Sequence, residues 1–169
     1  MGKGPLIGYI PIIGLPFCIY RASNSKMNEF EVTVVDNLMY KQTSLIKHCG
    51  DERFKFIKAD VSDTSKYFKE VKEADVIIPL ACIVGAPSCD KNPGIARTTN
   101  ESMIKWLSLV ATSKQKLIFP TTNSGYGIGQ DGIHCTEETP LNPISLYGIT
   151  KVHAEEAVLK AGGVTLRLA

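Results

Sequence analysis

The sequence lacks the features that mark several classes of protein. Its 169 residues carry a formal net charge of only +2, which gives no reason to expect a nucleic acid or a membrane surface as partner. It has five cysteines, an odd number, with no Cys-x-x-Cys pair, and its three histidines do not cluster with them. We therefore expect neither a zinc site nor a disulfide framework, and assign no metal ligand. Reduced thiols favour a cytoplasmic location.

A long uninterrupted hydrophobic run is also missing. Residues 5–20, PLIGYIPIIGLPFCIY, are apolar, and a secretory signal peptide is an alternative for them. Against this, Pro5, Pro11 and Pro16 would each break the helix that such a segment prefers. The run is also too short and too interrupted to span a bilayer. The sequence thus favours a cytoplasmic protein without a membrane segment.

What the sequence does contain is an alternation of two kinds of segment, within a length that favours a single domain over residues 1–169. Short β-branched runs of strand length lie at 31–36, 54–60, 75–81, 116–122 and 163–169, and the run around 6–13 is a candidate for a sixth. Amphipathic stretches lie between them at 64–73 (after Asp63 as N-cap), 93–112 (beginning at Pro93 after Asn92) and 145–161 (ended by Gly162 and Gly163). This order predicts an α/β fold, a Rossmann-type doubly wound parallel sheet with helices on both faces.

Candidate ligand-binding residues follow the strand runs, because a doubly wound sheet binds ligands beyond the carboxyl ends of its strands. Asp36 can accept hydrogen bonds from an adenosine ribose and would repel a 2′-phosphate, which favours NAD over NADP. Asp60 can hold the adenine amino group while Val61 packs on the ring. Leu80 and Ala81 let the backbone lie against a cofactor. Aspartates in turns and small residues in a core are equally ordinary, so both interpretations stay open.

Acid–base chemistry is indicated by Tyr147-Gly-Ile-Thr-Lys151. Positions i and i+4 share one face of a helix, so the lysine ammonium would favour the phenolate and lower the tyrosine pKa. Tyrosine then becomes a usable acid–base near neutral pH. The hydroxyl-rich segment 121–127, TTNSGYG, precedes this helix and can orient a substrate hydroxyl. The alternative is a half-buried Tyr147 beside a solvated Lys151 without catalytic role.

The segments TVVDN (33–37), KADVSD (58–63), PLAC (79–82), PTTNSGYG (120–127) and PLNPISLYGITKVHAEE (140–156) together resemble the NAD-dependent epimerase/dehydratase family, the extended branch of the short-chain dehydrogenases. The resemblance covers about residues 31–169. It implies hydride transfer from a sugar carbon to NAD, a nucleoside-diphosphate sugar as substrate, and a homodimer built through helices of this region.

The resemblance also implies roles for single residues. The catalytic set would be Thr122, which orients the reacting hydroxyl, Tyr147 as acid–base, and Lys151, which lowers the tyrosine pKa and binds the nicotinamide ribose. The cofactor-binding positions would be Gly8 and Gly14 for the pyrophosphate, Asp36 and Asn37 for the adenosine ribose, Asp60 and Val61 for adenine, Leu80 and Ala81 along the cofactor, and Asn100 in a structural or cofactor-side role. Glu155 matches a position that is usually structural.

Two departures from the family pattern are visible. The glycine-rich turn reads Gly8-Tyr-Ile-Pro11-Ile-Ile-Gly14, and the proline in the middle has no N–H to donate. The stretch from Gly14 to Asp36 is also a few residues long for the one helix and turn of the family. Second, the family's C-terminal substrate-binding part would begin near residues 166–169, so we expect a fragment or an altered gene product. Two alternatives to an active enzyme therefore stay open: a non-catalytic dinucleotide-binding or regulatory module, and an interaction protein with a vestigial site.

Overall fold

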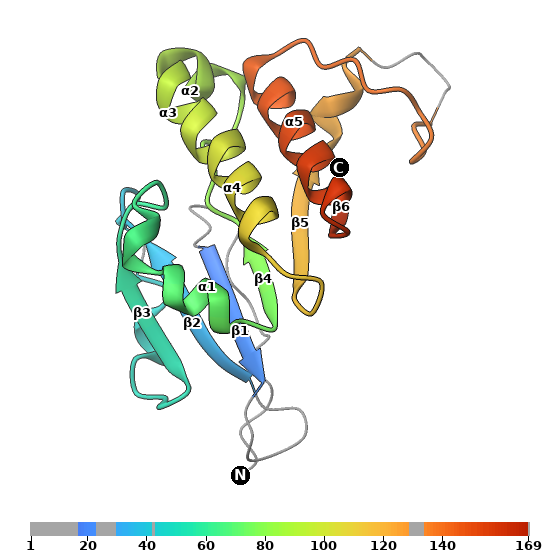
Figure 1. Ribbon diagram of the computed structural model, residues 1–169. Coiled ribbons are helices and arrows are strands. Elements are labelled where there is room, and N and C mark those ends of the chain that lie inside the picture. Colours follow the sequence, from blue (N-terminus) through green and yellow to red (C-terminus); the bar gives the residue numbers. More distant parts are fainter. Residues whose placement is uncertain (1–16, 23–29, 42, 129–133, 169) are drawn as a thin grey trace. The chain divides into compact units, whose positions relative to one another are not determined.

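The computed structural model describes residues 17–22, 30–41, 43–128 and 134–168, which form two compact units (Figure 1). Unit 1 comprises the described residues up to Ala81 together with Thr112–Lys116. Unit 2 comprises Cys82–Ala111 and the described residues from Leu117 onward. The expected strand at residues 6–13 lies outside the described residues.

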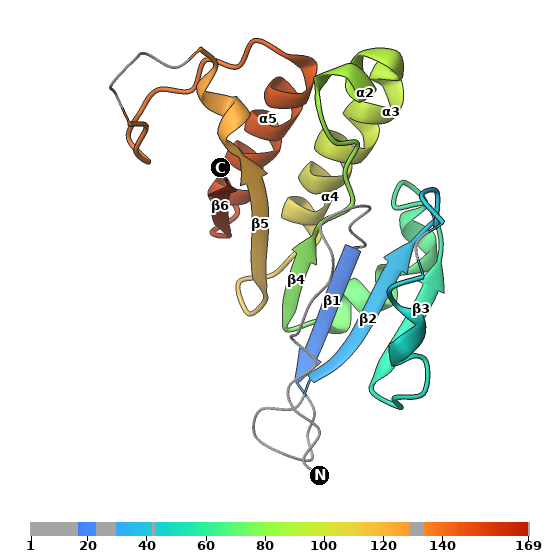
Figure 2. The same cartoon turned by 180° about the vertical axis from the view of Figure 1, so that it is seen from behind.

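Unit 1 is built on four strands that lie side by side in the order β3-β2-β1-β4 (Figure 2). They are β1 (Phe17–Ala22), β2 (Phe30–Asp36), β3 (Phe54–Lys58) and β4 (Val76–Pro79), with the helix α1 (Phe68–Glu73) preceded by a 3-10 turn at Thr64–Lys66. β2 and β3 are parallel, and Asp36 pairs with Lys58 at their carboxyl ends. The strands expected near 31–36, 54–60 and 75–81 are confirmed.

β1 departs from the expected parallel arrangement. It is antiparallel to both neighbours, so that Phe17 pairs with Val35 of β2 and with Pro79 of β4, and Ala22 pairs with Phe30. The interval between Gly14 and Asp36, expected to hold a helix and a turn, thus contains a strand. Its sequence FCIYRA is rich in residues that favour strands, and such a short run does not decide between helix and strand. The chain leaves β1 at the amino end of β2, away from Asp36.

The core of unit 1 comes from the alternating inward residues of β2. Val32 and Val34 are buried with Leu45, and Phe54, Phe56 and Ile78 pack against them. Tyr67, which is fully buried, donates its hydroxyl hydrogen to the carbonyl of Val61 just beyond β3. This bond fixes the chain at the carboxyl end of β3, where two of the candidate cofactor residues stand.

Unit 2 combines two parallel strands with a layer of helices. Its elements are α2 (Ala86–Lys91), α3 (Pro93–Arg97), a π-helical segment η3 (Thr98–Ser102), α4 (Met103–Val110), β5 (Lys116–Thr122, from its second residue onward), a 3-10 turn η4 (Asn123–Tyr126), α5 (Leu146–Lys160) and β6 (Val164–Leu168). Thr122 pairs with Leu168 where β5 and β6 end. α5 lies against α4, as both ribbon views show (Figures 1 and 2), and it also contacts η3.

The ends of α5 are set by local side chains and backbone. The Ser145 hydroxyl accepts the Gly148 N–H at 3.1 Å, which caps the first turn. At the other end Gly162 has a φ of +78°, and the Gly163 N–H bonds the Val158 carbonyl at 2.9 Å. This is the glycine-terminated Schellman arrangement, so the predicted stop at Gly162 and Gly163 is confirmed.

Two details of the expected helices differ. Asp63 stands before the turn at Thr64–Lys66, but its carboxylate accepts the Ser65 hydroxyl and caps no backbone N–H. The single helix expected at 93–112 is divided by η3, in which one turn takes the wider π geometry. Pro93 does occupy the first helical turn, as predicted.

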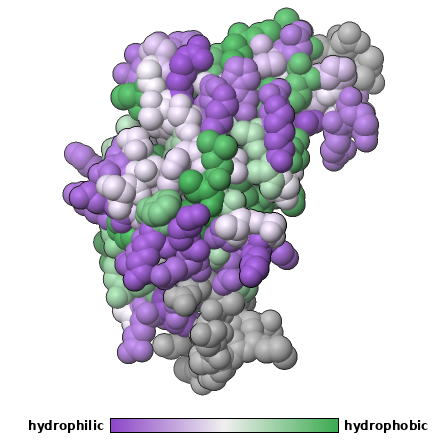
Figure 3. Space-filling view, viewed as in Figure 1, coloured by the Kyte–Doolittle hydropathy of each residue, from purple (hydrophilic) through white to green (hydrophobic). Residues whose placement is uncertain are grey.

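The surface seen in Figure 3 mixes hydrophilic and hydrophobic side chains. Leu109 of α4 is 84% exposed. Among the described residues, no helix combines the length and the apolar character needed to cross a membrane.

Candidate active site

Tyr147 stands in the first turn of α5, next to a glycine that lets this helix come close to the end of β5. A Cβ atom at Gly148 would lie 2.7 Å from the Ser124 carbonyl oxygen and 3.0 Å from the Cβ of Pro143. Only glycine therefore permits this approach. The consequence is that Tyr147 is brought to Thr122, the last residue of β5.

The Tyr147 side chain is half-buried and packs against the cluster of Ile83, Cys89 and Ala96. Burial and the nearby Cys82 thiol raise the pKa of Tyr147 to about 12, against the hydrogen bond with Thr122, which lowers it. The sequence predicts a pKa lowered by Lys151, whereas the net shift here is upward. The structure thus presents a neutral phenol, able to donate a proton.

Lys151 lies one turn further along α5 and is 6% exposed. Its ammonium donates to the Pro120 carbonyl at 2.9 Å and lies 4.0 Å from the centre of the Phe119 ring. Burial lowers the pKa of Lys151, while Cys82 and Glu155 act in the opposite direction. The solvated lysine of the non-catalytic alternative is therefore not what the structure contains.

Glu155, a further turn along α5, is 3% exposed and joins the helix to β6. Its Oε1 accepts from the Arg167 guanidinium at 2.9 Å and from the Thr165 hydroxyl at 3.1 Å. Because the carboxylate is buried and paired with a cation of the adjacent strand, its role in unit 2 is structural.

Asn100 is held in the π-helical segment η3 and is 1% exposed. Its side chain binds the backbone of Ile83 on both sides: the Ile83 N–H donates to Oδ1 at 2.8 Å, and Nδ2 donates to the Ile83 carbonyl at 2.9 Å. Asn100 therefore fixes the chain directly after Cys82.

In unit 1, the candidate carboxylates stand at the ends of β2 and β3. Asp36 is 8% exposed and its Oδ1 accepts the Leu38 N–H. Asp60 accepts from the Ser62 hydroxyl at 2.7 Å and from Asn37 Nδ2 at 2.9 Å. These bonds, that of the Ser62 hydroxyl first, lower the pKa of Asp60. The two strand ends are thus tied together by an amide–carboxylate contact, with acidic oxygens at the edge of the sheet.

The remaining cofactor candidates are apolar or lie elsewhere. Val61 is buried at 7% exposure, and Leu80 and Ala81 are half-buried after β4. Gly8 and Gly14, with Pro11 between them, lie outside the described residues. Among the described residues, no three His, Cys, Asp or Glu side chains form a group that could hold a metal ion.

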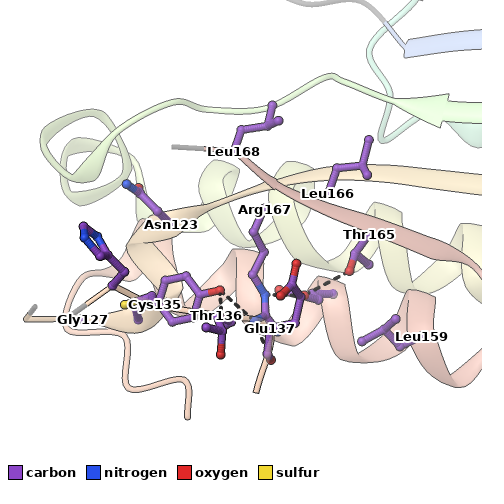
Figure 4. A pocket seen from close by; sticks show the side chains of 13 residues that line it. Asn123, Gly127, Cys135, Thr136, Glu137, Leu159, Thr165, Leu166, Arg167 and Leu168 are labelled. Carbon is purple, nitrogen blue, oxygen red and sulfur yellow. Dashed lines mark hydrogen bonds and ion pairs between the residues drawn. The ribbon is translucent and has the colours of Figure 1, made fainter. Parts of the chain in front are cut away.

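A pocket of about 1000 Å³ lies on the β6 side of α5 (Figure 4). Arg167 extends along its wall, where it contacts Glu155, the Tyr126 hydroxyl at 3.0 Å and the Glu137 carbonyl at 3.1 Å. The charge of Arg167 is balanced within the wall by Glu155. Neither Tyr147 nor Lys151 lines this pocket.

The chain matches the model of a known protein family. Residues 20–165 match the NAD dependent epimerase/dehydratase family, and the chain belongs to this family. The resemblance noted from the sequence is confirmed.

Curated relatives include the UDP-glucose 4-epimerase of Lactobacillus helveticus, 33% identical over 122 residues, which are 68% of this chain and 36% of that protein. The bifunctional polymyxin resistance protein ArnA of Wigglesworthia glossinidia brevipalpis is 28% identical over 69% of this chain and 18% of its own length. The chain therefore spans about a third or less of these relatives.

Solved structures with the same fold include the UDP-Glc/GlcNAc 4-epimerase of Campylobacter jejuni, with a TM-score of 0.63 and 29% identity over 78% of this chain and 41% of that one. The UDP-glucuronic acid 4-epimerase of Bacillus cereus, solved in complex with NAD, has a TM-score of 0.69 and 25% identity over 80% of this chain and 46% of that one. The Rossmann-type fold class is confirmed, with β1 as the local departure. NAD, expected as cofactor, is that of the family.

The described residues fit parts of this cofactor. In unit 1, the Asp36 carboxylate and the Asn37 amide stand at the carboxyl end of β2, where an adenosine ribose would find hydrogen-bond acceptors. In unit 2, the Lys151 ammonium has three N–H donors, of which the bond to Pro120 uses one. The pyrophosphate turn lies outside the described residues, so the fit rests on these two groups.

Proposed function

We propose that the chain is the NAD-binding part of a nucleotide-sugar epimerase or dehydratase, with Thr122, Tyr147 and Lys151 as its catalytic set. The observation that carries the proposal is the assembly of these side chains in unit 2. Thr122 ends β5, Gly148 beside Tyr147 lies close to the Ser124 carbonyl just beyond that strand, and Lys151 is buried one helical turn after Tyr147. The names of the relatives, which act on UDP-sugars, support the substrate class.

The bound cofactor supplies the hydride acceptor. The residues of the chain transfer the proton and orient the sugar and the cofactor. Thr122 binds the sugar hydroxyl that is oxidised. Tyr147 acts as its phenolate and accepts the proton of that hydroxyl as the hydride leaves the same carbon, becoming a neutral phenol that returns the proton in the reverse step. Lys151 binds ribose hydroxyls and places a positive charge near the phenol, which favours the phenolate while the proton is away.

In unit 1, Asp36 and Asn37 take the adenosine ribose, Asp60 and Val61 hold the adenine, and Leu80 and Ala81 lie along the cofactor. Asn100 acts indirectly, through the backbone of Ile83. Gly8 and Gly14 would approach the pyrophosphate. A homodimer and a cytoplasmic location belong to the same proposal.

A titration with NAD tests cofactor binding first. NAD at a hundredfold excess over its Kd stabilises the folded chain by about 2.7 kcal/mol, which raises the melting temperature. Absence of any shift at millimolar NAD would remove every dinucleotide-binding function. Turnover of UDP- and dTDP-sugars by the parent and by Tyr147→Phe then tests catalysis. Equal turnover in both would exclude the tyrosine as acid–base.

A second function, a non-catalytic dinucleotide-binding or regulatory module, is favoured by one specific observation. β1 runs antiparallel to β2, so the chain leaves β1 at the edge opposite to Asp36. A parallel first strand would deliver the phosphate-binding turn at the Asp36 edge. A melting shift with NAD, combined with no turnover of any sugar nucleotide, would establish this function instead.

A further inference from the structure

Lys151 places a buried positive charge in unit 2. Its side chain is almost wholly enclosed, and burial lowers its pKa. Glu155, one turn further along α5, carries the opposite charge, but its carboxylate is paired with Arg167 at 2.9 Å. Within the part of the chain that the structure describes, no ion pair joins Lys151 to a carboxylate. The ammonium is therefore held by groups of another kind.

Two groups of β5 receive this charge. The Pro120 carbonyl accepts from Nζ at 2.9 Å, and Nζ lies over the Phe119 ring, 4.0 Å from its centre. An ammonium within about 6 Å of a ring centre is attracted by the negative face of the ring, and the attraction grows where water is excluded. Because Phe119 is 1% exposed, this contact has both the geometry and the dry surroundings of a strong cation–π interaction.

The position of the Phe119 ring is set by the strand. β5 buries alternate side chains, those of Leu117, Phe119 and Thr121, because successive side chains of a strand point to opposite faces. Close packing keeps such a buried ring in one place. The same strand ends at Thr122, so the ring ties the Lys151 ammonium to the element that carries the candidate hydroxyl.

We propose that Phe119 is a positioning residue for Lys151: its ring face holds the ammonium and, with the Pro120 carbonyl, fixes where the remaining N–H donors point. This inference rests on the proposed function, since it assigns a part to the same site. The sequence marks Phe119 only as a member of the strand run 116–122.

The titratable groups near the ammonium act in the same direction as the ring. Cys82, from the loop after β4, and Glu155, from α5, both raise the pKa of Lys151 against the effect of burial. A ring face also favours the charged form of the lysine. A change confined to the electrons of the ring leaves Cys82 and Glu155 as they are, and so isolates the contribution of Phe119.

The test measures the pKa of Lys151 in the free chain, without cofactor or sugar. The Lys151 signal is the lysine Cε resonance that each protein shows and its Lys151→Met counterpart lacks. Phe119 is replaced by phenylalanine analogues whose rings carry one, two and then three fluorine atoms, which withdraw electrons from the ring face and change its size little. The pKa of Lys151 should fall with each fluorine, by about half to one pH unit over the series. Phe119→Leu removes the ring face and should lower the pKa at least as far.

A matched control lies in α1, where Lys72 Nζ is 5.7 Å from the centre of the exposed Phe68 ring. The same fluorine series at Phe68 should leave the pKa of Lys151 unchanged. A constant pKa of Lys151 across the Phe119 series would overturn the proposal. A fall in Phe119→Leu alone would overturn it as well, since only lost packing would then explain it. Failure of the proposed function appears separately, as absent turnover with an intact fluorine trend.

Discussion

In unit 1, the candidate carboxylates bind mainly groups two residues away: Asp36 accepts the Leu38 N–H, and Asp60 accepts the Ser62 N–H at 2.9 Å. In unit 2, the candidate side chains bind groups far along the chain, since Lys151 reaches Pro120 and Asn100 reaches Ile83. Local turns alone can place the carboxylates of unit 1. The cluster of unit 2 exists only because four separate segments fold together. Substitutions in unit 2 should therefore affect catalysis and stability, and those in unit 1 chiefly the cofactor.

The largest effect is expected for Lys151→Met. Methionine keeps apolar contact with Phe119 but removes the ammonium, so turnover falls by about a hundredfold or more while the chain stays folded. Turnover of a UDP-sugar and the melting temperature are measured together. Lys160→Met, an exposed position of the same helix, serves as control and retains full turnover. A Lys151→Met chain as active as this control would place the catalytic cluster elsewhere.

The next effect, on stability, is expected for Asn100→Ala. The substitution leaves the buried N–H and carbonyl of Ile83 without their partner, which costs about 1–3 kcal/mol. Denaturant unfolding followed by fluorescence of the single tryptophan, Trp106, measures this loss. Asn142→Ala, at an exposed position, should change stability by no more than about 0.5 kcal/mol. Equal stability of the two variants would show that the contact with Ile83 is not what holds this loop.

A smaller effect, on cofactor binding, is expected for Asp36→Asn. Asparagine keeps an acceptor for the Leu38 N–H but removes the negative charge. NAD should bind about tenfold more weakly, a difference of about 1.4 kcal/mol, and NADP relatively better. Calorimetric titration with both dinucleotides measures the ratio, with Glu52→Gln as the exposed acidic control of unit 1. An unaltered preference for NAD over NADP would show that Asp36 only stabilises the local turn and does not bind the ribose.

The smallest effect is expected for Asp60→Asn, as a pH dependence. Because hydrogen bonds lower the pKa of folded Asp60, its carboxylate stabilises the fold at pH values above the unfolded pKa. That contribution is lost as the pH falls below about 4, through the folded pKa. Because Asp60 is exposed, this effect is small. On acidification, the free energy of unfolding should fall more in the parent than in Asp60→Asn, by about 0.5 kcal/mol or less. Melting curves between pH 7 and pH 3 measure it, and parallel curves for the two proteins would contradict it.

Strands and helix ends were predictable where the pattern is local. Runs of β-branched residues predicted the strands β2 to β6. Two consecutive glycines predicted the end of α5, because Gly162 takes a backbone conformation that other residues rarely adopt. β1 was not predictable in this way. Its direction is set by pairing with residues of two other strands, from Phe30 opposite Ala22 to Pro79 opposite Phe17, and no local pattern records that.

The candidate site was predictable only in part. Thr122, Tyr147 and Lys151 follow from the order of segments, and their catalytic roles stay predictions. The fixed course of the chain after Cys82 could not be foreseen, because it depends on Asn100 binding Ile83 from a helical segment 17 residues away. The π turn that carries Asn100 leaves no mark in a hydrophobic pattern, since it adds a single residue to one helical turn.

The most direct test is to mix the NAD-saturated chain with UDP-glucose and record the absorbance of reduced nicotinamide, for the parent and for Tyr147→Phe. The account predicts a rise in the parent and none in Tyr147→Phe, because hydride transfer requires the proton of the sugar hydroxyl to leave through the tyrosine. An equal rise in both proteins, or no rise in a parent that binds both NAD and the sugar nucleotide, would contradict it.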